Sequence, residues 1–206
     1  MFRLIRKLFI KFDKSVCYFR GLLMFGKLIY VEKNVTVRGY ENIEIGKKCK
    51  IFQGSIIDAS RGKIVFKNNV TICVNSIVNS AGGFIEIDIG TTIGDFCNLY
   101  GQGGLTIEKD VMVASCVQIV PNSHTYKDVT KAIKFQDEES KGITIRNGCW
   151  IGTNVAILDD VIIGKNTVIG AGSIVNKSIP EYCVAAGVPV RIIKQYNFEK
   201  QEWVNA

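Results

Sequence analysis

The fold is decided by residues 145–175, which read IRNGCW IGTNVA ILDDVI IGKNTV IGAGSI V and open each six-residue unit with isoleucine or valine. The fifth position of each unit is mostly small or branched, as at Cys149, Val155 and Val161. Neither the 3.6-residue period of an amphipathic helix nor the alternation of a half-buried strand produces this spacing. A short fixed period instead indicates a solenoid, in which each unit buries its aliphatic residue against the unit below.

The same period continues upstream with less regularity, between Ile45 and Ile119. Frame changes near 58–65, 79–87 and 100–106 indicate bulges or loops at the corners of the solenoid. Strands about one repeat long would then stack about 4.8 Å apart, the ordinary spacing of paired strands. We therefore predict an all-β solenoid.

Three segments are expected along the chain. Residues 1–40 form a basic amphipathic arm or cap, residues 41–180 form the solenoid, and residues 181–206 form a short C-terminal tail. An external loop over 121–142 interrupts the repeat with polar and charged residues, and it contains the only histidine of the chain, His124. Insertions in a solenoid stay outside the core and often mark its working face.

The charge of the chain is uneven. Seven basic residues and one acidic residue lie within 1–30, so this segment carries most of the net charge of +7. The repeat body is nearly neutral and has no basic stripe, which argues against nucleic acid as a partner.

The seven cysteines are an odd number and form no CxxC pair. Cys49, Cys97 and Cys149 fall at the fifth position of repeat units, where a thiol acts as a small apolar filler. We expect these three cysteines to be reduced and buried in a cytoplasmic protein, rather than to hold a metal or form disulfides.

The N-terminal arm has an apolar stripe. At 100° per residue its members fall on one arc about 120° wide, with basic residues mainly opposite. The stripe consists of Phe2, Ile5, Leu8, Phe9, Phe12, Val16, Phe19 and Leu23. One interpretation is a cap that packs the stripe on the solenoid, because solenoids need capped ends. The other is an interfacial helix, in which residues 1–23 rest on the inner face of an anionic membrane. The arm lacks the uninterrupted apolar stretch of a signal peptide.

Several motifs resemble those of the hexapeptide-repeat acyltransferases, in the branch that holds galactoside, maltose and exopolysaccharide (colanic acid-like) O-acetyltransferases. They are GCWIG at 148–152, VIIG at 161–164, VIGAGSIV at 168–175, Ile179-Pro180, AAGVPVRIIK at 185–194 and Asn122-Ser123-His124. The resemblance implies a left-handed parallel β-helix, a homotrimer with active sites between subunits, and acetyl-CoA as acyl donor.

The resemblance also implies site residues. His124 falls on the family's catalytic histidine, and an imidazole suits general-base catalysis near neutral pH. Backbone N–H groups at Ala114 and Ala171 match those that receive the oxyanion and thioester, although tight coil packing explains both alanines equally well. Tyr100 and Gln102 stand where the galactoside enzymes have an asparagine and an aspartate, so a small free galactoside is a doubtful acceptor.

Five more positions match contacts to the cofactor, and Trp150 is expected to lie beside the cofactor groove. The five positions are Thr153, Asn176, Lys177, Arg191 and Lys194. The basic residues suit the 3′-phosphate and diphosphate of coenzyme A. Solvated surface charge is the alternative for Lys177 and Lys194, and a structural corner aromatic is the alternative for Trp150.

The leading hypothesis is an acetyl-CoA-dependent O-acetyltransferase that acts on a sugar hydroxyl of a surface polysaccharide or its lipid-linked precursor. An N-acetyltransferase of an amino sugar or a small xenobiotic is the alternative, and a non-catalytic β-helix scaffold is a third class. The γ-type carbonic anhydrases share this prism but bind zinc through three histidines, whereas this chain has one, so no metal is expected.

Overall fold

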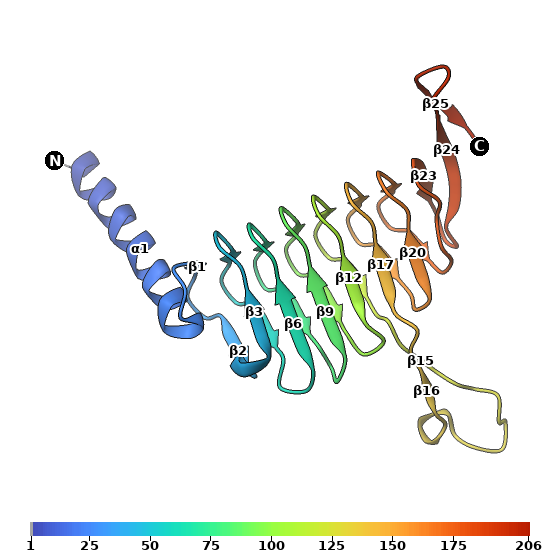
Figure 1. Cartoon of the computed structure of the whole chain (residues 1–206), viewed down its shortest axis with the longest axis horizontal. Helices are drawn as coiled ribbons and strands as arrows, with labels where there is room; N and C mark the ends of the chain where they lie inside the picture. Colours follow the sequence, from blue (N-terminus) through green and yellow to red (C-terminus); the bar gives the residue numbers. More distant parts are fainter. Residues whose placement is uncertain (1) are drawn as a thin grey trace.

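The computed structural model describes the backbone of residues 2–206 and the side chains of residues 13–206. Helix α1 (Phe2–Phe25) stands at one end of a prism of short strands, and the chain ends in a hairpin at the other end (Figure 1). Three parallel sheets form the sides of the prism, which we call faces A, B and C. We call the edge between faces A and B corner AB, and the edge between faces B and C corner BC.

Each turn of the chain adds one strand to each face in the order A, B, C. Face A contains β1 (Tyr30–Val31), β4 (Lys50–Ile51), β7 (Thr71–Ile72), β10 (Thr92–Ile93), β13 (Met112–Val113), β18 (Trp150–Ile151), β21 (Val168–Ile169) and β23 (Cys183–Ala186). Face B contains β2 (Thr36–Arg38), β5 (Ile56–Asp58), β8 (Ile77–Asn79), β11 (Asn98–Tyr100), β14 (Gln118–Ile119), β19 (Ala156–Ile157) and β22 (Ile174–Val175). Face C contains β3 (Ile43–Ile45), β6 (Lys63–Phe66), β9 (Phe84–Ile87), β12 (Leu105–Ile107), β17 (Ile143–Ile145) and β20 (Val161–Ile163). The predicted parallel β-helix is confirmed.

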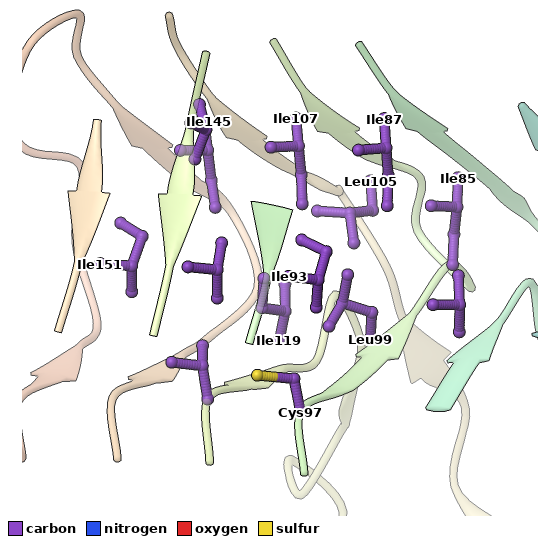
Figure 2. Packing of buried hydrophobic residues seen from close by; sticks show 14 of the residues in the cluster. Ile85, Ile87, Ile93, Cys97, Leu99, Leu105, Ile107, Ile119, Ile145 and Ile151 are labelled. Atoms are coloured by element: carbon purple, nitrogen blue, oxygen red, sulfur yellow. The ribbon is translucent and has the colours of Figure 1, made fainter. Parts of the chain in front are cut away.

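The six-residue period predicted the core correctly. Every first-position residue from Ile145 to Val175 is 0% exposed, and the fifth-position residues from Cys149 to Ile179 are at most 2% exposed. Ladders of such side chains fill the interior of the prism (Figure 2). Burial of one such aliphatic side chain contributes about 1.5–3 kcal/mol.

Polar residues at the fifth position are satisfied by the backbone. The Thr167 hydroxyl donates to the carbonyl of Pro180 at 2.8 Å, and the Ser76 hydroxyl donates to the carbonyl of Gly94 at 2.7 Å. Buried hydroxyls that are paired in this way carry little penalty. The solenoid therefore accepts serine and threonine in its interior.

The first coil begins before residue 41. Strands β1 and β2 already belong to faces A and B, and Ile29, Val31 and Val37 are buried in the common core. A 3₁₀ turn, η1 (Tyr40–Asn42), then leads into β3. The segment 1–40 thus contains both the helix and the start of the solenoid.

Helix α1 contacts the solenoid through a face other than its apolar stripe. Cys17 is 2% exposed, and a Cβ on Gly21 would overlap the carbonyl of Ile29. By contrast, the stripe residues Phe19 and Leu23 are 58% and 69% exposed. The expectation that the stripe packs on the solenoid is wrong for these residues, because the small Cys17–Gly21 surface allows the closer approach. The other stripe residues up to Phe12 lie outside the side chains that the structure describes. No helix among the described residues is long and apolar enough to cross a membrane.

The cysteines are all free, but they are not all buried. Cys49, Cys97 and Cys149 are buried as predicted, whereas Cys116 is exposed and Cys73 is half-buried. Cys116 occupies a left-handed corner position (φ 64°) just before a buried residue, so its side chain points outward. Burial raises the pKa of Cys97 and of Cys149 to about 11.

The C-terminal tail is a β-hairpin. Strand β24 (Arg191–Asn197) pairs antiparallel with both β23 and β25 (Glu202–Asn205), which extends face A beyond the last coil. Edge-to-face contacts join its aromatic rings: the ring centroid of Tyr196 lies 5.1 Å from that of Phe198 and 5.4 Å from that of Trp203. The sequence pattern missed this hairpin because it contains no six-residue unit.

Candidate active site

The histidine loop leaves the prism at corner BC, between β14 and β17, and projects away from the coils (Figure 1). Its two arms pair antiparallel as β15 (Ser123–His124) and β16 (Glu138–Glu139), with His124 directly opposite Glu138. Beyond them lies a 3₁₀ turn, η2 (Ile133–Phe135). The interrupted repeat therefore forms an ordered arm with its own hairpin pairing.

Glu138 connects the histidine to the body of the prism. Its Oε1 lies 3.6 Å from Nε2 of His124, a separation suited to charge attraction but longer than a hydrogen bond. Its Oε2 accepts a hydrogen bond from Nε2 of Gln102 at 3.2 Å. The His124 and Glu138 side chains are 48% and 44% exposed, so solvent and ligands can reach both. A carboxylate in this place can orient the imidazole and stabilise the cation formed when the ring takes a proton.

Four of the residues predicted from the sequence lie along corner BC. Tyr100 ends β11, Gln102 follows it, and exposed Asn176 and Lys177 directly follow β22 on the last coil. His124 is on the loop that leaves this same corner. Corner BC thus gathers the expected base, both acceptor positions and two of the cofactor positions.

The other cofactor positions lie on face A and its C-terminal extension. Trp150 is 50% exposed and pairs with Met112 on one side and with Val168 on the other. These cross-strand partners form a row across face A, which continues from Val168 through Val184 to Lys194. Trp150 and Lys194 are therefore three strand spacings apart, roughly 14 Å. Arg191 pairs with Ala186 at the start of β24 and is also exposed.

Small residues line corner AB. A Cβ on Gly152 would lie 2.6 Å from the backbone nitrogen of Ala171, so neighbouring coils approach closely there. Thr153 is exposed at this corner, and its carbonyl accepts a hydrogen bond from the N–H of Gly172 at 2.8 Å. At corner AB, a linear ligand could therefore lie directly against the backbone.

The two alanines differ in what their backbone offers. The N–H of Ala114 donates to the carbonyl of Ile151 at 2.9 Å, so this donor is already used between coils. Ala171 lies exposed in a turn, and its N–H has no acceptor among the residues that the structure describes. Of the two expected oxyanion donors, only Ala171 is available in this arrangement, because Ala114 lies in the regular ladder.

A single chain does not bring the predicted site together. His124 and its companions are at corner BC, whereas the Trp150 row and the Ala171 turn lie across face B, on face A and at corner AB. The acceptor half, with Asn176 and Lys177, is thus at corner BC, whereas the rest of the donor half is on face A and at corner AB.

Glu138 is the functional candidate that sequence reasoning missed. It lies in the charged part of the loop, where the repeat gives no register, and its pairing with His124 depends on the hairpin fold of the loop. A carboxylate inside the insertion that also holds the chain's one histidine was the available signal.

The chain is similar to proteins of one transferase family. Residues 142–177 match the family model described as bacterial transferase hexapeptide (six repeats). The Escherichia coli K12 protein WbbJ, named as a lipopolysaccharide biosynthesis O-acetyl transferase, is 32% identical over 168 residues. The match spans 78% of this chain and 86% of WbbJ. The chain belongs to the hexapeptide-repeat transferase family, in its sugar O-acetyltransferase branch, and is an acyltransferase.

Two further proteins are similar to this chain over part of the sequence or in fold alone. The galactoside O-acetyltransferase of E. coli K12 is 46% identical over 106 residues, and the match spans 48% of this chain and only 52% of that enzyme. The N-acyltransferase AntD of Bacillus cereus, solved with dTDP and 3-hydroxybutyryl-CoA, has a TM-score of 0.55 at 19% identity, and the match covers 84% of this chain and 82% of AntD. AntD shares the fold.

Proposed function

We propose that the chain is an acetyl-CoA-dependent O-acetyltransferase that modifies a sugar hydroxyl of a surface polysaccharide or its lipid-linked precursor. The observation that carries this proposal is the exposed His124, held opposite Glu138 on an arm at the prism edge. The similarity to WbbJ supports a polysaccharide acceptor, and the CoA-bound structure of AntD supports coenzyme A as the carrier. The odd number of cysteines supports the cytoplasm as the location.

The chemistry follows from what the residues can do. His124 takes the proton of the sugar hydroxyl while that oxygen bonds to the acetyl carbonyl carbon. Glu138 stabilises the resulting imidazolium, and the N–H of Ala171 from a second copy is available to the carbonyl oxygen. Acetyl-CoA, when bound, supplies the acetyl group as a thioester. The bond between the carbonyl carbon and the sulfur then breaks, and His124 gives its proton to the departing thiolate. The products are the acetyl ester and the free thiol of coenzyme A, and His124 is again a neutral base.

We propose that this enzyme works as a homotrimer with sites shared between copies. The acceptor half at corner BC, with Asn176 and Lys177, and the rest of the donor half at face A and corner AB lie on different edges of one prism. Threefold packing of such prisms would set corner BC of one copy beside face A of the next. Arg191 and Lys194 from the second copy would then hold the phosphates of coenzyme A, as their charge suits.

The test is acetyl transfer from acetyl-CoA to a panel of sugars, amino sugars and lipid-linked glycans. His124→Ala should fold normally and lose about 10²–10⁴ in rate, the usual range for a lost general base. Tyr126→Ala, a matched change two residues away at a side chain 75% exposed, should keep its rate. An active His124→Ala enzyme would contradict the assignment, and exclusive transfer to amino groups would make the protein an N-acetyltransferase.

A further inference from the structure

Large apolar side chains are exposed at the C-terminal half of α1 and the turn that follows. Phe19 is 58% exposed, Leu22 47%, Leu23 69% and Leu28 70%. We call these four residues the N-terminal patch. Such a concentration of exposed apolar surface marks a site of interaction rather than scattered surface residues.

The patch cannot turn inward to be covered by the chain's own core. The opposite face of α1 is already in contact with the solenoid through Cys17 and Gly21, and the ring of Tyr18 meets that of Tyr30 edge-on at 5.7 Å. Rotation of the helix to bury Phe19 and Leu23 would break this close packing. The helix also extends past the first coil, which leaves it open to a partner (Figure 1).

The charge of the arm selects the kind of partner. Residues 1–30 have seven basic residues and one acidic residue, and the exposed Lys14 lies five residues before Phe19. Two such arms repel each other, so a second copy of the arm is a poor cover for the patch. A surface that is both apolar and negatively charged fits, because an interfacial helix buries its apolar side among lipid chains while basic residues meet anionic headgroups.

We propose that the N-terminal patch, together with the basic arm, docks this protein on the surface of an anionic lipid bilayer. This inference goes beyond acyl transfer and does not depend on it. Docking would place the prism beside the lipid-linked precursor proposed above as an acceptor.

Flotation of the full chain with vesicles tests the proposal. We expect binding to phosphatidylcholine vesicles that contain phosphatidylglycerol, weaker binding to phosphatidylcholine alone, and release at high salt, because exposed charges are screened. Phe19→Ser/Leu23→Ser should lower the partition coefficient about tenfold or more, since two large apolar groups no longer enter the lipid. Ile89→Ser, at a body residue 48% exposed, is the matched control and should bind like the wild type.

Two results would overturn the proposal. One is equal vesicle binding by the wild type and Phe19→Ser/Leu23→Ser, or no binding by either. The other is a change in oligomeric state of the double variant, measured by sedimentation without lipid, which would assign the patch to a second copy. Circular dichroism should show an unchanged fold, because both substituted side chains are mostly exposed.

Discussion

Replacement of Glu138 by glutamine gives a quantitative test of the site geometry. The substitution keeps the shape of the side chain but removes the negative charge 3.6 Å from Nε2 of His124. Because both side chains are nearly half exposed, the effective dielectric is close to that of water, and attraction at this separation is worth about 1 kcal/mol. Loss of that stabilisation from the imidazolium should slow the chemical step about five- to tenfold.

The neighbouring carboxylate provides a matched control. Glu139 points to Lys127, with Oε1 3.0 Å from Nζ, and contacts neither His124 nor Gln102 among the described interactions. Steady-state rates at saturating acetyl-CoA should therefore fall for Glu138→Gln and stay within about twofold for Glu139→Gln, as expected for a surface pair. Equal effects of the two substitutions, or a loss with Glu138→Gln as large as that of His124→Ala, would refute the assigned role.

Three further predictions follow from the architecture. Co-assembly of His124→Ala chains with Arg191→Ala/Lys194→Ala chains should restore about a quarter of the wild-type rate. Each shared site needs an intact His124 from one copy and an intact Arg191 and Lys194 from the next, and random mixing of the two variants gives this pairing at about one seam in four. No recovery of the rate would place both halves of the site in one chain. Ile157→Ala should cost about 2–5 kcal/mol in the free energy of unfolding because Ile157 is 0% exposed, whereas Leu158→Ala, at a side chain 42% exposed, should cost far less in the same denaturant titration. A thiol reagent at pH 8 should modify Cys116 first. The folded-state pKa values of Cys97 and Cys149 are raised to about 11, above the unfolded thiol value of about 8.5. Their contribution to the free energy of unfolding is therefore complete below about pH 8.5 and is lost as the pH rises toward about 11. Unfolding titrations at alkaline pH would measure this loss.

The ladder of the fold could be predicted because it is a local property. One aliphatic residue every six positions, from Ile145 to Val175, sets the length of each side of the prism, and burial of these residues against the next coil stacks the coils. The hairpin β24–β25 could not be predicted in this way, since its stability comes from aromatic contacts such as Tyr196 with Trp203, which follow no repeat.

Candidate site residues could be proposed from the sequence, but their arrangement could not. His124 was evident as the one histidine in the insertion, but its pairing with Glu138 depends on how the loop folds back. The contact face of α1 was misjudged because periodicity measures hydrophobicity, whereas the close approach at Gly21 depends on side-chain size.

The way the histidine arm is attached has a consequence for how this protein can change over time. The arm begins after β14 and ends before β17, and the parallel pairing of β12 with β17 and of β14 with β19 continues past it without a shift in register. Changes in the part of the arm beyond His124 and Glu138 can therefore leave the register of the coils, and with it the stability of the prism, unaffected.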